Sequence, residues 1–180
     1  MITPQQILLL PGWQSSGPGH WQSLWRERFG YTWVEQHDWM RPLRGDWIAR
    51  LEDVVLDSAA PLVLVAHSLG CQLVAAWAAH SKNTQRVAGA LLVAPPDVAG
   101  DALRSALPSW YPPVLQRLPF PTTVVTSTDD PYCSPACATA FASAWGSTPV
   151  NVGALGHINA DSGLVEWPQG QALLRTLIDS

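Results

Sequence analysis

The clearest structural pattern in the sequence is LVLVAHSLGCQLVAAWAAH, from Leu62 to His80. It begins with a run of aliphatic residues, which is typical of a buried strand, and ends with an alanine-rich run, which favours a helix. Ser68 stands between the two runs, with small residues, Ala66 and Gly70, two places to either side. Small flanking residues let the backbone fold back without side-chain collisions, so the pattern predicts a sharp turn at Ser68.

The five residues AHSLG at 66–70 resemble a nucleophile elbow, in which a serine on a strained strand-to-helix turn presents its hydroxyl above a sheet. Gly70 fits the usual G-x-S-x-G form, and Ala66 departs from it. Alanine is the smallest residue with a Cβ atom, so this departure does not contradict the geometry. The open alternative is a serine that only caps a buried helix.

Short β-rich runs alternate with helical patterns along most of the chain. This alternation is typical of a parallel sheet covered by helices on both faces, so the predicted fold class is α/β. Asp46 is the predicted N-cap of a helix that includes Trp47, and Ser134 with Pro135 predicts the start of another. The predicted strands are Ile7–Leu10, Thr32–Glu35, Leu62–Ala66, Val87–Val93, Thr123–Ser127 and Pro149–Val152, and the other predicted helices begin near Trp21 and Gln171.

The 180 residues are enough for a single domain with a sizeable core, and we expect residues 1–180 to form one. Residues 94–121 break the alternation because they are rich in proline. They are too few for a separate domain, so we expect a loop excursion near the active-site edge of the sheet, with a short helix within Val98–Leu107.

Composition argues against several classes of partner. A net charge of −4 without a cluster of Lys and Arg disfavours nucleic acid. The apolar run near the N-terminus is too short for a signal or membrane segment, so we expect a soluble, cytoplasmic protein without membrane contact. Three cysteines cannot form a complete disulfide framework, which fits a reducing compartment. The spacing of Cys133 and Cys137 could suggest a metal site, but no second pair of metal ligands lies near them in the sequence. No metal and no cofactor are expected.

Two further polar stretches follow predicted strands, TDDPYC at 128–133 and GALGHINADSG at 153–163. They supply Asp130 and His157, and in an open parallel sheet such residues gather with Ser68 at the carboxyl edge. The chain order Ser, Asp, His is that of an α/β-hydrolase triad. Asp129 is the alternative acid, and we prefer Asp130 because Pro131 restricts the backbone directly after it.

These residue types suit acyl transfer. His157 would take the proton of Ser68 during attack and return it to the leaving group, while Asp130 would hold the imidazole in the right tautomer. An oxyanion hole is also needed, and the expected donors are the backbone N–H groups of Leu69 and Trp13.

The segments PGWQSSGPGHWQSLW, AHSLG, DDPYC and GHINADSGLVEWPQG resemble the RBBP9/YdeN family of small serine hydrolases, and the resemblance covers essentially the whole chain. It implies a compact three-layer α/β-hydrolase fold without a large cap domain, on a six-stranded parallel sheet in the order 2-1-3-4-5-6. It also implies that Ser68, Asp130 and His157 match the family's triad.

The expected function is a metal-independent, carboxylesterase-like serine hydrolase that cleaves a small ester or amide through an acyl-enzyme on Ser68. Two alternatives stay open: a non-catalytic protein-interaction module that keeps the fold, and an acyltransferase. A small-molecule substrate is the expected partner, and the sequence identifies no protein partner.

Aromatic and histidine residues near the expected site have two readings each. Trp13, Trp110, Tyr132 and Trp167 fall in loops where they would line a substrate pocket or simply pack within the loops. His20 is expected to be a hydrogen-bonded structural histidine rather than a catalytic one, and His67 has at most a supporting role.

Overall fold

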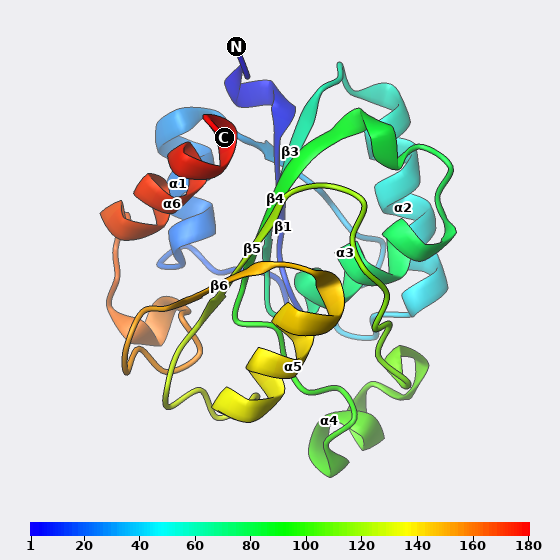
Figure 1. Ribbon diagram of the computed structural model, residues 1–180, viewed down its shortest axis with the longest axis vertical. Helices are drawn as coiled ribbons and strands as arrows, with labels where there is room; N and C mark the ends of the chain where they lie inside the picture. The colour runs from blue at the N-terminus through cyan, green and yellow to red at the C-terminus, as the bar shows by residue number, and fades with distance from the viewer.

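The computed structural model describes all 180 residues, which form one parallel sheet in the order β2-β1-β3-β4-β5-β6. Each strand pairs in parallel with its neighbour. The predicted order and direction of the strands are therefore confirmed (Figure 1). The strands are β1 (Ile7–Leu10), β2 (Thr32–Trp33), β3 (Leu62–His67), β4 (Val87–Val93), β5 (Thr122–Thr126) and β6 (Thr148–Asn151).

Helices cover both faces of this sheet, α1 and α6 on one and α2, α3 and α5 on the other (Figure 1). No helix is both long enough and apolar enough to cross a lipid bilayer. The helices are α1 (Trp21–Phe29), α2 (Arg44–Asp57), α3 (Leu69–His80), α4 (Asp101–Ala106), α5 (Pro135–Trp145) and α6 (Pro168–Ile178), with short 3₁₀ turns η1 (Pro4–Gln6), η2 (Thr84–Arg86), η3 (Pro108–Trp110) and η4 (Ala160–Ser162).

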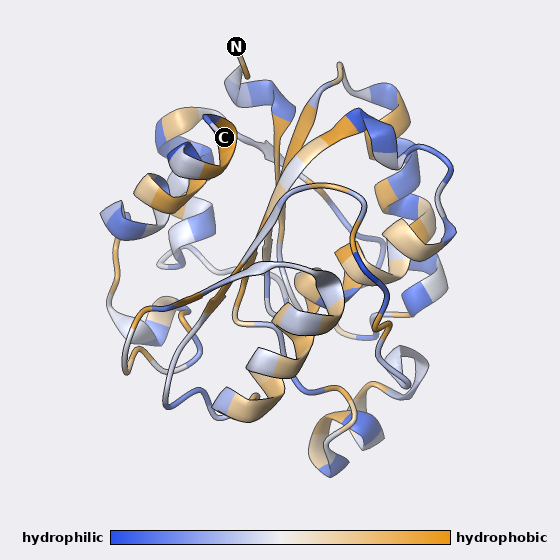
Figure 2. Ribbon diagram, viewed as in Figure 1, coloured by the Kyte–Doolittle hydropathy of each residue, from blue (hydrophilic) through white to orange (hydrophobic).

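Alternating side chains of the central strands build a core on each face of the sheet. In β3, Leu64 faces the core under α2, α3 and α5, while Val63 and Val65 face the core under α1 and α6. Every residue of β3 is buried, as expected for a strand covered on both sides. Figure 2 shows the apolar residues concentrated along these central strands.

Several predicted boundaries need correction. Helix α2 begins at Arg44, so Asp46 is not its N-cap but lies in its first turn, where a carboxylate interacts favourably with the helix dipole. Helix α6 begins at Pro168 rather than near Gln171. Ser134 does cap α5, since its side chain accepts a hydrogen bond from the Cys137 N–H.

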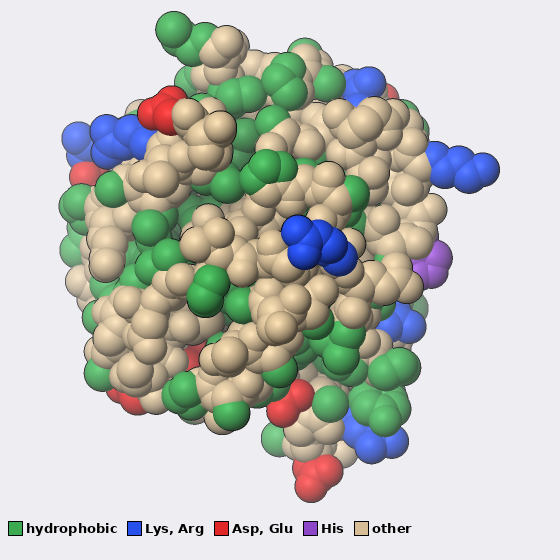
Figure 3. Space-filling model, viewed as in Figure 1, with side chains coloured by type: hydrophobic (Ala, Val, Ile, Leu, Met, Phe, Trp, Pro, Cys, Tyr) green, Lys and Arg blue, Asp and Glu red, His purple; other side chains and the backbone are tan.

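Segment 94–121 connects β4 to β5 and carries α4 and η3. In Figure 1 this segment extends past the lower end of the sheet, on the side where α4 is labelled. The charged side chains visible in Figure 3 are scattered rather than gathered into one patch. The segment leaves β4 at its carboxyl end, the edge of a parallel sheet where functional residues gather.

Candidate active site

Ser68 lies on the sharp turn between β3 and α3. Its backbone has φ 53° and ψ −125°, a conformation that side-chain-bearing residues rarely adopt. The Ser68 N–H donates to the Val93 carbonyl at 2.9 Å, so the neighbouring strand β4 holds the turn in place. Strain of this kind is typical of functional sites, and here it raises the hydroxyl above the carboxyl edge of the sheet.

Two glycines allow the close packing around this turn. A Cβ atom on Gly70 would lie 2.3 Å from the Leu10 carbonyl oxygen, and one on Gly12 would lie 2.8 Å from the Cβ of Ser68. Both contacts are too short for any side chain. Ala66, by contrast, is fully buried within β3 and its methyl group belongs to the core, so the departure from the usual glycine is accommodated.

The structure brings Ser68, His157 and Asp130 into one chain of hydrogen bonds. His157 Nε2 lies 2.8 Å from Ser68 Oγ, and His157 Nδ1 lies 2.9 Å from both carboxylate oxygens of Asp130. Because a carboxylate only accepts hydrogen bonds, the Nδ1 atom carries the proton. The Nε2 atom is then free to accept from the Ser68 hydroxyl.

The adjacent Asp129 points elsewhere. Its carboxylate accepts from the Ser127 hydroxyl and from the Gly156 N–H, both at 2.8 Å. These two hydrogen bonds lower the pKa of Asp129. Asp129 therefore fastens the loop after β5 to the loop that carries His157, and the carboxylate at the imidazole is that of Asp130.

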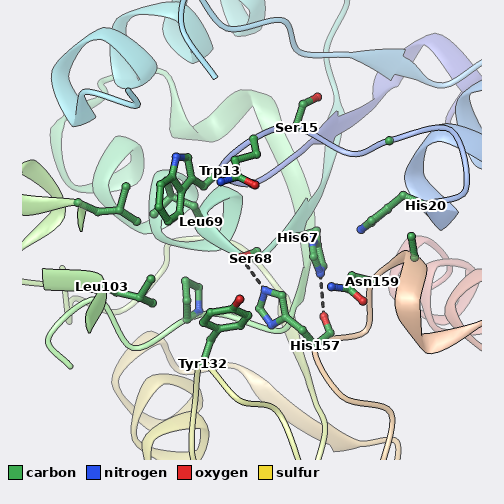
Figure 4. Close-up of a pocket in the computed structure, with 16 residues that line it drawn as sticks. Trp13, Ser15, His20, His67, Ser68, Leu69, Leu103, Tyr132, His157 and Asn159 are labelled. Atoms are coloured by element: carbon green, nitrogen blue, oxygen red, sulfur yellow. Dashed lines mark hydrogen bonds between the residues drawn. The ribbon is translucent and has the colours of Figure 1, made fainter. Parts of the chain in front are cut away.

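Two further histidines continue the row of imidazole rings (Figure 4). The ring of His67 lies 5.0 Å from that of His157 and 4.6 Å from that of His20. His67 Nε2 donates to the His157 carbonyl oxygen at 2.9 Å, so it holds the backbone of the residue that reaches Ser68. Burial, with a smaller effect from the neighbouring histidines, lowers the pKa of His67 well below its usual value and that of His20 to about 4. Both rings are neutral at pH 7.

His20 has the structural role that the sequence predicts. It occupies the N-cap position of α1, where its Nδ1 accepts from the Gln22 N–H at 3.1 Å. Its side chain also lines the cavity described next, which the sequence did not predict.

A cavity of about 320 Å³ opens above Ser68 and His157. Trp13 and Tyr132 line it. The backbone N–H groups of Trp13 and Leu69 are unbonded at this cavity, since Leu69 is the first residue of α3 and Trp13 has no acceptor. No group of three or more His, Cys, Asp or Glu side chains is arranged to hold a metal ion.

The expectation that Trp110 and Trp167 line the cavity is wrong. Trp110 is 1% exposed, packs edge-on against Trp47 and donates its Nε1–H to the Pro42 carbonyl. Trp167 is 2% exposed and packs against Trp21 beneath α1. Both rings fill gaps between helices and loops, because burying so large an apolar surface is more favourable than exposing it.

Other residues line the cavity in their place. Leu103 and Leu107, four residues apart on and just after α4, present an apolar edge to it, and Ser15 and Asn159 also line it. The i, i+4 spacing of the two leucines within a proline-rich segment was the available sequence signal. Ser15 and Asn159 gave none, because isolated polar loop residues are common on any surface.

Comparison with known proteins shows the family to which the chain belongs. The family model described as serine hydrolase matches residues 7–176. No curated protein matches the sequence. A YdeN-like hydrolase from Pectobacterium atrosepticum is 28% identical, with a TM-score of 0.83 over 95% of this chain and 89% of that one.

Two structures from Bacillus subtilis share the fold at lower identity. The ydeN gene product is 19% identical, with a TM-score of 0.81 over 97% of this chain and 98% of that one. The carboxylesterase CesB is 16% identical, with a TM-score of 0.64 over 97% and 84%. Since the family model spans nearly the whole chain, the protein belongs to the serine hydrolase family, as a YdeN-like enzyme with the α/β-hydrolase fold.

Proposed function

We propose that the protein hydrolyses small, carboxylesterase-type esters or amides through an acyl-enzyme on Ser68. The observation that carries this proposal is the hydrogen-bonded chain from Ser68 Oγ through His157 to Asp130 at the floor of the cavity. The likeness to a carboxylesterase supports the fold alone, so we infer the substrate class from the residues of the site.

In the first half of the reaction, Ser68 Oγ attacks the substrate carbonyl carbon while His157 Nε2 takes the hydroxyl proton. Asp130 stabilises the resulting imidazolium through the Nδ1–H. The negative charge that forms on the carbonyl oxygen is received by the N–H groups of Leu69 and Trp13. The bond to the leaving group then breaks, and His157 gives its Nε2 proton to the departing alcohol or amine.

In the second half, water attacks the acyl carbon of the ester on Ser68. His157 Nε2 accepts a proton from this water, and the collapse of the intermediate returns it to Ser68 Oγ. The products are a carboxylic acid and the regenerated enzyme. Every step uses groups that belong to this chain, so the proposed reaction needs no metal or cofactor.

The competing proposal of a non-catalytic interaction module gives no reason for this alignment. A binding module has no use for a strained serine, a neutral acceptor nitrogen and a buried carboxylate held in line. An acyltransferase would share the acyl-enzyme and differ only in the acceptor, so product analysis in water separates it from a hydrolase.

Steady-state turnover of short-chain aryl esters tests the proposal. We expect wild type to release acid and phenol, and Ser68→Ala to lose on the order of 10⁴-fold or more in kcat. Equal turnover by the folded variant and by wild type would reject Ser68 as the nucleophile.

A further inference from the structure

The cavity above Ser68 has two unlike walls. In Figure 4, Trp13 and Leu103 lie on one side of Ser68, and His20 and Asn159 lie on the other. No Lys, Arg, Asp or Glu lines the cavity, and burial lowers the pKa of His20 and of His67, so both of these rings are neutral. Such a cavity offers no charged partner for a carboxylate, phosphate or ammonium group, so the portion of the substrate near the scissile bond is uncharged.

His20 provides an unused hydrogen-bond donor on the polar side. Its side chain is 4% exposed, and its Nδ1 is occupied as the acceptor that caps α1. In the neutral ring the proton is therefore on Nε2, and this buried atom has no hydrogen-bond partner. Buried polar atoms in folded proteins nearly always have one, so an unpaired donor beside a cavity calls for a ligand acceptor.

The two walls also differ in their relation to the reacting atoms. Asn159 follows His157 by two residues on the same loop, so the polar wall adjoins the nitrogen that would protonate the leaving group. The apolar wall includes Trp13, whose N–H would receive the carbonyl oxygen of the acyl group. The leaving group thus belongs on the polar side and the acyl chain on the apolar side.

We infer that the preferred substrates are uncharged esters with an apolar acyl chain and a leaving group that carries a neutral oxygen acceptor, which His20 Nε2–H binds. This inference rests on the hydrolase function proposed above. It makes His20 a specificity-determining residue in addition to a helix cap.

A matched pair of esters tests this assignment. Butyl butanoate and 2-methoxyethyl butanoate have the same number of heavy atoms and differ by one CH₂ replaced by oxygen. His20→Asn is the matching variant, because asparagine is a good N-cap and is too short to replace Nε2. We expect the ratio of kcat/KM for the ether ester to that for the butyl ester to fall about tenfold in the variant, the usual effect of one lost hydrogen bond.

If His20 were only structural, His20→Asn would change kcat/KM equally for both esters and leave their ratio unchanged, which would overturn the inference. If His20→Asn selectively lowered kcat/KM for an ester with the ether oxygen in the acyl chain, and not for one with the ether oxygen in the leaving group, the assignment of the two walls would be overturned. If wild type hydrolyses neither ester and also fails to turn over aryl esters, the proposed function fails together with the inference. Turnover of aryl esters with an unchanged ether ratio would reject the inference alone.

Discussion

Two adjacent aspartates make an internal comparison for the role of the acid. Asp130 accepts from His157 Nδ1 and also from the Tyr132 N–H at 2.9 Å. The Tyr132 N–H bonds Oδ1, and both Oδ1 and Oδ2 lie 2.9 Å from Nδ1, so in Asp130→Asn an amide oxygen that stays with the Tyr132 N–H puts the amide NH₂ at the Oδ2 position beside Nδ1. The NH₂ group donates, so it favours the imidazole tautomer with the proton on Nε2, and that tautomer cannot accept from Ser68.

The expected loss is large because the base is in the wrong state and the imidazolium loses its countercharge. A tautomer-reversing Asp→Asn change at such a site lowers kcat about 10⁴-fold, or about 5.4 kcal/mol in activation free energy. Asp129→Asn is the control, since its oxygen can still accept from Ser127 and Gly156. We expect that variant to retain kcat within about tenfold of wild type.

Steady-state kinetics with one aryl ester, together with circular dichroism of each variant, measure both effects. An equal loss of activity in folded Asp129→Asn and folded Asp130→Asn would contradict the assignment of Asp130 as the acid. An Asp130→Asn variant that kept more than about a tenth of the wild-type kcat would contradict it as well.

Three further predictions concern packing, positioning and pH. Gly70→Ala should lower the free energy of unfolding by about 3 kcal/mol in urea titrations, because the new methyl group would meet the Leu10 carbonyl oxygen at 2.3 Å. His67→Leu should lower kcat about 10- to 100-fold with little change in KM, because His157 loses its backbone hydrogen bond; a change confined to KM would contradict this positioning role. Burial lowers the pKa of His20 to about 4 in the folded protein, below its value of 6.5 in the unfolded chain. The unfolded chain therefore binds the proton at a higher pH, and the free energy of unfolding falls as the pH drops from 6.5 to 4. Between pH 7.5 and pH 5, the free energy of unfolding measured in urea should fall by about 2 kcal/mol less in His20→Asn than in wild type. An equal fall in the two proteins would contradict the assignment.

The elbow was predictable because it depends on a local pattern, whereas the strand order followed from the resemblance to a known family. An apolar run followed by AHSLG and a helical run specifies the strand, the turn and the helix without reference to the rest of the chain. The start of α2 was missed because Asp46 is a good N-cap in isolation, whereas the structure places it in the first turn of a helix that begins at Arg44.

The cavity was less predictable, because its walls come from segments far apart in the chain. Trp110 and Trp167 looked like pocket residues from their loop positions, and long-range packing against Trp47 and Trp21 decided otherwise. The second role of His20 also depends on distant residues, since only the folded chain places its ring beside His67. Sequence patterns report which elements form, and contacts between elements decide which side chains reach the site.

We propose that Ser68 is an activated nucleophile, and the mass of the intact protein after treatment with a fluorophosphonate tests this claim. Wild type should gain one phosphonyl group, peptide mapping should place it on Ser68, and folded Ser68→Ala should gain none. A folded wild type that remains unlabelled, or a label that persists in Ser68→Ala, would contradict the claim.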